Sequence, residues 1–154
     1  MTPLHIKNLH ALKEMTGREV GVTEWFQITQ QRVHQFAEAT EDRQWIHVNR
    51  ERASQESPYG TTIAHGFLTL SLIGYFVKEL IDIQDGVGLA VNYGLNRVRF
   101  PAPVPSDSRI RARIFLLAWK ELADSIEVTF QVTIESDQSE KPSCVAEWIV
   151  RYYA

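Results

Sequence analysis

The sequence predicts an α+β fold in which one antiparallel sheet packs against one long apolar helix. Two observations carry this prediction. Residues 125–135 alternate apolar and polar side chains without a miss, which is the period of a strand with one buried face. Residues 63–81 form the most apolar stretch of the chain, and the part from Gly66 to Val77 has no charged residue. Such a stretch is typical of a helix buried in a core.

Length and composition indicate one domain over residues 1–154, because a chain of this length can bury a substantial core. The composition is 44% hydrophobic and 23% charged, as in soluble globular proteins. A formal net charge of -3 gives no basic footprint, so nucleic-acid binding is not expected. Cys144 is the single cysteine, which excludes a disulfide framework within the chain, argues against a cysteine-based metal site and fits a reducing compartment.

The N-terminus and the apolar stretch bear on location. The first residues lack the basic region, apolar region and cleavage site of a secretory signal. The charge-free part of the apolar stretch is shorter than the about 20 residues that cross a bilayer. We therefore expect a cytoplasmic protein that makes no membrane contact.

Capping residues and periodicity predict the remaining elements in order. Short links between successive strands favour antiparallel pairing. The expected elements are a helix over 8–16 capped by Asn8, a strand at 24–28, a helix over 29–39 capped by Thr29, a loop over 40–48, exposed helical turns over 49–56 capped by Asn49, the long helix from about Ile63 to about Leu80, a loop over 82–88, and strands over 90–100, 109–114, 125–135 and 144–153, with a hairpin connection at 137–142.

An acid and an imidazole stand five residues apart in the segment Asp42-Arg43-Gln44-Trp45-Ile46-His47. Neighbours on a helix face are three or four residues apart, so a loop or a helix start would have to bring the two side chains together. Taken singly, Asp42 could be a turn residue and His47 an ordinary core or loop histidine. Trp45 and Phe67, with their apolar neighbours, are expected to desolvate both groups and shift their pKa values toward neutrality. The pair could then take a proton from a water and return one nearby.

His65-Gly66, at the start of the apolar run, is the second candidate. A structural interpretation makes His65 a core residue and Gly66 a point of close packing. Beside Asp42 and His47, however, a backbone amide at a helix N-terminus would supply the electrophilic element for a carbonyl substrate.

Three stretches of the chain form one combined motif with a known counterpart. They are Phe36-Ala37-Glu38-Ala39-Thr40-Glu41-Asp42-Arg43-Gln44-Trp45-Ile46-His47-Val48-Asn49, Ile63-Ala64-His65-Gly66-Phe67-Leu68-Thr69-Leu70-Ser71-Leu72 and Arg99-Phe100-Pro101-Ala102-Pro103-Val104. This motif resembles the MaoC-like dehydratase family, which contains the (R)-specific enoyl-CoA hydratases, also called hydratase 2. The tryptophan in the first stretch, with Val91-Asn92-Tyr93-Gly94-Leu95-Asn96, is similar to the branch named after the nodulation protein NodN. The resemblance covers roughly residues 20–150, and the motif is specific only in combination.

The resemblance implies a hot-dog fold, in which an antiparallel sheet wraps around a long central helix, and a homodimer. It implies that Asp42 and His47 hold the water that adds to a trans-2-enoyl thioester, giving a (3R)-3-hydroxyacyl thioester carried on coenzyme A or acyl carrier protein. The Gly66 amide would bind the thioester carbonyl, and no metal or redox cofactor would take part. Substrate contacts are expected from residues in these motifs: Trp45, Ile63, His65, Phe67 and Asn92.

The chain departs from the family pattern at two places. Gln44-Trp45 stands where members commonly have Asn-Pro, and Gly74 occupies the position of a supporting serine, with Ser71 one turn earlier. Two other functions stay open. One is a thioesterase of the same fold, which would direct water at C1, and the other is a non-catalytic module that binds acyl thioesters.

Overall fold

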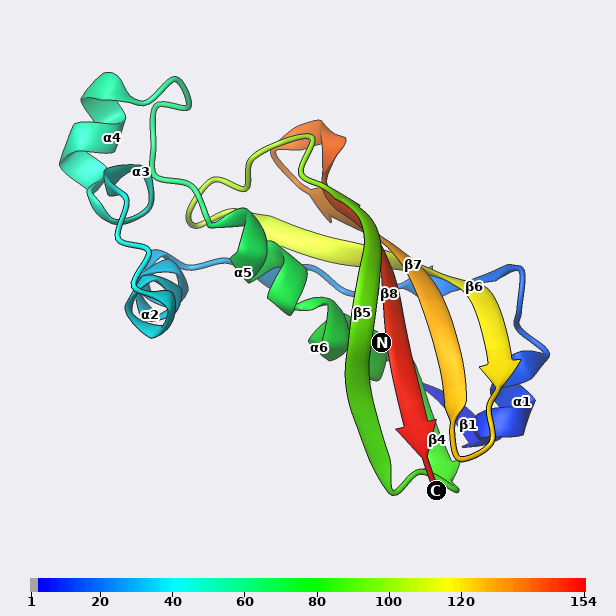
Figure 1. Ribbon diagram of the computed structural model, residues 1–154. Helices are drawn as coiled ribbons and strands as arrows, with labels where there is room; N and C mark the ends of the chain where they lie inside the picture. Colours follow the sequence, from blue (N-terminus) through cyan, green and yellow to red (C-terminus); the bar gives the residue numbers. More distant parts are fainter. Residues whose placement is uncertain (1–2) are drawn as a thin grey trace.

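The computed structural model describes residues 3–154 (Figure 1). Its elements are, in chain order, β1 (Leu4–Asn8), α1 (Leu9–Lys13), β2 (Arg18–Val22), β3 (Phe26–Gln27), α2 (Gln30–Thr40), α3 (Trp45–Val48), α4 (Arg50–Glu56), α5 (Gly66–Ser71), α6 (Ile73–Leu80), β4 (Ile81–Asp85), β5 (Leu89–Arg99), β6 (Arg109–Glu121), β7 (Ile126–Ser136) and β8 (Ser139–Tyr153).

A six-stranded antiparallel sheet in the order β2-β6-β7-β8-β5, with β3 also pairing with β6, forms the body of the molecule. The alternation predicted for residues 125–135 is confirmed: Val128, Phe130, Val132 and Ile134 of β7 are fully buried, and the residues between them are at least partly exposed. Helices α5 and α6 lie against the sheet (Figure 1) and complete the core through apolar side chains that include Leu68, Ile73, Phe76, Val77 and Leu80. The predicted sheet and apolar helix are therefore both present.

The long helix differs from the prediction at its start and in its middle. It begins at Gly66, because Ile63 forms an isolated β-bridge with Pro105 and the Ala64 amide donates to the Val104 carbonyl at 2.8 Å. It is also divided into α5 and α6 at Leu72, whose amide bonds to carbonyls within α5. The prediction of one continuous helix from Ile63 was thus wrong, and the extended segment before Gly66 becomes part of the site.

The N-terminal helices follow their predicted caps. The side chains of Asn8, Thr29 and Asn49 each accept a hydrogen bond from a backbone amide three residues later, at 3.0, 3.2 and 2.9 Å. The prediction of a loop over 40–48 was wrong in part, because residues 45–48 form the short helix α3. Helices α2, α3 and α4 gather at one end of the sheet, and α1 lies at the other (Figure 1).

Strands β1, β2 and β4 were not predicted, and residues 82–88 were expected to form a loop. Strand β4 instead pairs parallel with β1 in a separate two-stranded sheet, with Ile6 opposite Ile83. Ile6 and Ile81 are buried against the core, so tertiary packing decides that β4, a largely polar segment, forms a strand.

Among the described residues, no helix is long and apolar enough to cross a membrane.

Strand β5 is an open edge of the sheet. It pairs only with β8 among the described strands, and its large apolar side chains are exposed. These side chains are Leu89, Val91, Tyr93 and Leu95. An edge strand of this length with apolar side chains is a surface that another chain would cover.

Candidate active site

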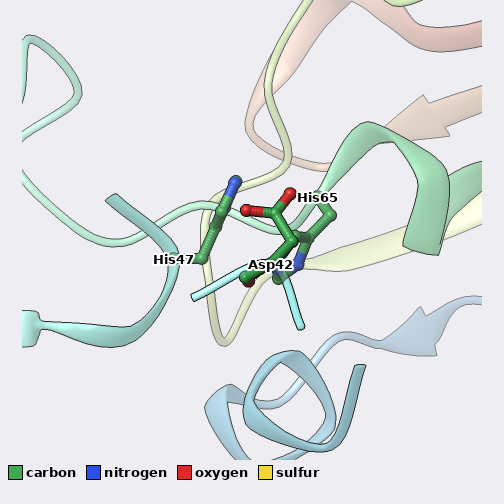
Figure 2. Close-up of side chains that lie close together, drawn as sticks. All are labelled: Asp42, His47 and His65. Atoms are coloured by element: carbon green, nitrogen blue, oxygen red, sulfur yellow. The ribbon is translucent and has the colours of Figure 1, made fainter. Parts of the chain in front are cut away.

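Asp42, His47 and His65 come together at the junction of three segments (Figure 2). Asp42 lies in the loop after α2, His47 on α3, and His65 directly before α5. One carboxylate oxygen and one ring nitrogen from each histidine lie within 4.8 Å of one another. The structure thus brings together the acid and the imidazole singled out in the sequence and adds a second imidazole.

Hydrogen bonding fixes the tautomer of His47. The residue is 7% exposed, and its Nδ1–H donates to the Ile63 carbonyl at 2.7 Å. This leaves the Nε2 lone pair free to accept a proton. Burial lowers the pKa of His47; the bond to Ile63 and the charge of Asp42 oppose this shift, and the charge of His65 adds to it. The imidazole is therefore a neutral base at physiological pH.

Gln30 braces the backbone on which His47 sits. Its buried side-chain amide donates to the His47 carbonyl at 2.7 Å and accepts from the Thr62 hydroxyl. It thereby joins α3 to the extended segment that leads to Gly66. Sequence reasoning missed this residue, because a glutamine in the first turn of a helix is usually solvated and gives no signal.

His65 contacts both members of the acid–imidazole pair. It is 3% exposed, and its Nε2–H donates to the backbone carbonyl of Asp42 at 2.9 Å. Its ring stacks on that of His47 with the centroids 3.7 Å apart and the planes 23° apart. The Phe36 ring lies 5.0 Å away. A core position for His65 is therefore correct, but its hydrogen bond and its stacked partner belong to the site.

Asp42 does not share this burial. Its side chain is exposed, so the expected desolvation of both groups was wrong for the acid. Glu41 ends α2 in the left-handed conformation, with φ 61°, and Asp42 lies directly after it, in the loop between α2 and α3. Phe67, expected to help exclude water, is itself 68% exposed.

Gly66 begins α5 beside a cavity of about 290 Å³. His47, Ile63, Gly66 and Phe100 are among the residues that line it. The first amides bonded to the His65 carbonyl are those of Leu68 and Thr69, so the Gly66 amide precedes the helical bonding pattern. A Cβ at Gly66 would meet the Phe100 ring at 3.1 Å, so a larger residue here would require the ring or the start of α5 to shift.

The other residues predicted to contact the substrate lie in different parts of the structure. Ile63 lines the cavity, whereas the Trp45 ring packs 4.4 Å from the Arg52 guanidinium and is not part of the lining. Phe67 and Asn92 lie in a separate groove of about 370 Å³ between α5, α6 and β5. There Asn92 accepts from the Trp148 indole N–H at 3.0 Å.

This groove adjoins a larger hollow of about 720 Å³ beneath β5, and both are lined by Gly74, Asn92 and Trp148. The lining is mainly apolar, with side chains from α6, β5 and β8. Together they form a long surface depression beside the helix that begins at Gly66.

Acid–base chemistry suits the three side chains better than metal binding. A metal ion lies near the plane of an imidazole that binds it, about 2.0–2.1 Å from the nitrogen. The stacked rings of His47 and His65 lie in nearly parallel planes, so their lone pairs do not converge on one point. A neutral imidazole base and a free amide that line one cavity, with a carboxylate close to the imidazole, could instead activate a water against a polarised carbonyl.

Comparison with known proteins bears on the family of the chain. The chain is 50% identical over 144 residues to 3-hydroxyacyl-thioester dehydratase Z of Mycobacterium tuberculosis, covering 93% of this chain and 94% of the relative. It is 41% identical over 148 residues to nodulation protein N of Rhizobium leguminosarum bv. viciae, covering 95% and 91%.

Among solved structures, the monoamine oxidase regulatory protein from Archaeoglobus fulgidus aligns with a TM-score of 0.76 at 20% identity, over 99% of this chain and 98% of that one. The fold is the hot-dog fold, with the sheet against α5 and α6. A MaoC-like domain model matches residues 11–138. The chain therefore belongs to the MaoC-like domain family.

Proposed function

We propose that the protein interconverts trans-2-enoyl thioesters and (3R)-3-hydroxyacyl thioesters, as a hydratase in one direction and a dehydratase in the other. The observation that carries this proposal is the approach of Asp42 to His47, which lines one cavity together with Gly66 at the start of α5. The relative named as a 3-hydroxyacyl-thioester dehydratase, at 50% identity, supports the same reaction.

In this mechanism the Gly66 amide donates to the thioester carbonyl and stabilises the enolate-like charge that develops as water attacks C3. Asp42 and His47 remove a proton from that water and return one to C2. The Nε2 atom of His47 is free for this role because Nδ1–H is held by Ile63. The two groups act as a coupled pair, so their acid and base roles are not divided between them.

The substrate contacts follow from the two hollows. Ile63 would bound the reacting end from the cavity lining, and His65 would bound it through the His47 ring on which it stacks. Trp45 would support α3, which carries His47, and Phe67 and Asn92 would contact the acyl chain in the groove. The thioester would be carried on coenzyme A or acyl carrier protein. Because hydration moves only water and protons, the proposed reaction needs neither a metal nor a redox cofactor.

The deciding experiment follows the loss of enoyl-thioester absorbance when the purified protein meets crotonyl-CoA. Activity that yields the (3R) product, and falls by at least about 100-fold in kcat in Asp42→Asn and His47→Gln, would support the proposal. His10→Gln, on helix α1 at the far end of the sheet, is the matched histidine control and should keep wild-type turnover. The folded state of each variant is checked by circular dichroism.

Other outcomes point to the other functions. Release of free thiol from a saturated acyl-CoA, with no hydration of enoyl thioesters, would identify a thioesterase. Saturable binding of acyl thioesters without turnover of either substrate would identify a binding module. Wild-type turnover in either Asp42→Asn or His47→Gln would remove that residue from the mechanism.

We further propose that the protein is a homodimer in which β5 pairs with β5 of a second copy. The open edge and the exposed apolar side chains of β5 support this arrangement. Light scattering should give twice the 17.7 kDa of one chain. Val91→Lys on β5 should weaken the dimer, and Leu117→Lys on β6, at a similarly exposed apolar residue, should leave it intact. A wild-type mass of one chain would contradict the proposal.

A further inference from the structure

We propose that His65 is a positioning residue that sets the separation of Asp42 and His47. The edge of its ring contacts Asp42, and the face of its ring contacts His47. The functional consequence rests on the proposed hydration reaction. The contacts themselves do not, and they can be tested without a substrate.

The edge contact is made to the main chain of Asp42. The Nε2–H of His65 donates to the Asp42 carbonyl oxygen at 2.9 Å, across 23 residues of sequence. Because the bond uses the backbone, it fixes where the Asp42 residue sits and leaves the carboxylate free. The loop of Asp42 is exposed, and among the described residues the ion pairs of the neighbouring Arg43 reach only Glu38 and Glu41. The bond from His65 therefore ties this loop to a distant segment, which those ion pairs do not.

The face contact fixes the His47 ring. Stacked at 3.7 Å with a 23° tilt, His65 blocks rotation of His47 toward that side, and the bond from Nδ1–H to Ile63 sets the rotation within the plane. Phe36 packs 5.0 Å from His65 and supports the stack from α2. One side chain therefore contacts both members of the pair.

The second ring nitrogen argues against a role as core filler. With the proton on Nε2, Nδ1 of His65 carries a lone pair that is buried and has no hydrogen-bond partner. A buried polar atom without a partner is unfavourable, so an apolar ring would suit this position better if packing were its only task. The bond to Asp42, which an apolar ring could not make, accounts for an imidazole here.

The stack also affects the charge state of His47. The titratable groups whose charge acts on His47 are His65 and Asp42, and Tyr59 lines the same cavity. Burial of His47 and its closeness to His65 disfavour a positive charge on the His47 ring. Removing the His65 ring would admit water and remove this repulsion, and both changes raise the pKa of His47.

Three substitutions separate the two contacts. His65→Gln keeps an amide donor as many bonds from Cα as Nε2 is and loses the stack. His65→Phe keeps a stacked ring and loses the donor, and His65→Ala loses both. His10→Gln is the matched control. We expect kcat on crotonyl-CoA to fall about tenfold in each of the first two and about 100-fold in His65→Ala, with little change in KM, since small misplacements of reacting groups cost factors of this size.

The substrate-independent measurement is the pKa of His47, followed by NMR titration of its ring protons. It should rise in His65→Ala and stay unchanged in His10→Gln. Unchanged kcat and unchanged His47 pKa in folded His65→Ala would overturn the proposal. Failure of all three variants to fold, read by thermal unfolding, would also overturn it in favour of a purely structural role. Absence of hydratase activity in the wild type would refute the proposed function, whereas the NMR result would still test the positioning role.

Discussion

The cavity at His47 and the groove beside β5 are built in opposite ways. At the cavity and beside it, the polar groups are held by bonds within the chain: Ile63 and Gln30 hold His47, and His65 holds Asp42. The groove is lined mainly by apolar side chains, and its outer wall is an edge strand that pairs only with β8 among the described strands. The first hollow is thus organised by hydrogen bonds, and the second by apolar packing along a sheet edge.

From this difference we expect the cavity to determine the reaction and the groove to determine which substrates are preferred. Reacting groups must be held to within about 0.5 Å, which the bonds around His47 can do. A long apolar substituent needs only shape and exclusion of water, and a movable or shared wall can supply both. Substitutions in the cavity should therefore lower turnover of every substrate, whereas substitutions in the groove should change which substrates are preferred.

The largest effect within this comparison is expected from Gly66→Ala. The added Cβ would meet the Phe100 ring at 3.1–3.2 Å, so the ring or the start of α5 must shift. Alanine suits a helix, and Phe100 is exposed enough to yield, so stability should hardly change. Displacing the amide from the carbonyl should lower kcat about tenfold for short and long substrates alike. Steady-state kinetics and thermal unfolding test this.

A double-mutant cycle with Phe100→Ala checks the cause of that effect. If the clash with Phe100 displaces the amide, Gly66→Ala should cost little in the Phe100→Ala background. An equal cost in both backgrounds would show that the ring is not responsible.

A smaller and more selective effect is expected from Gly74→Leu. The nearest atom to a Cβ at Gly74 is in the Trp148 ring at 4.0 Å, and the position lines both the groove and the hollow beneath β5. A leucine would fill the space where they meet. We expect kcat/KM for long enoyl thioesters to fall about fivefold, with crotonyl-CoA unaffected.

Glu79→Leu, an exposed position on the same helix that lines neither hollow, is the control for this comparison. Equal losses on short and long substrates in Gly74→Leu would mean that the groove does not hold the acyl chain.

The sequence was sufficient where the deciding interactions are local. The caps at Asn8, Thr29 and Asn49 and the alternation in β7 depend on neighbouring residues, and all were predicted correctly. The approach of Asp42 to His47 was also expected, from their place in the motif and the family resemblance, and their side chains do lie close together.

What the sequence could not show depends on contacts between distant segments. The parallel pairing of β1 with β4, the bond from Gln30 to His47 and the stack of His65 on His47 each join segments whose approach only the fold decides. The left-handed conformation of Glu41, directly before the exposed Asp42, is one that most residues avoid and that a glutamate in the sequence does not indicate. The interpretation of His65 as a core residue was correct but incomplete, because His65 is buried and also contacts the proposed reacting groups.

The smallest expected effect is a shift of the acid limb of the pH–rate profile. Burial lowers the pKa of His47, so the neutral base should persist below pH about 6.5, the ordinary value for histidine. In the unfolded chain the same imidazole takes up a proton near pH 6.5, whereas in the folded protein it does so only at lower pH. The contribution of His47 to stability is therefore complete above pH about 6.5 and is lost as the pH falls through the folded-state pKa.

Urea unfolding between pH 4.5 and 8 measures the effect on stability, and the pH dependence of kcat/KM measures the effect on activity. Both can be followed on one series of samples. His47→Gln should flatten the change in unfolding free energy across this window, and His10→Gln should not. An acid limb centred above pH 6.5 would mean that the charge of Asp42 and the Ile63 hydrogen bond outweigh burial. Water would then reach His47 more readily than its burial and its hydrogen bond to Ile63 indicate. The cavity and the groove would differ less in their access to water.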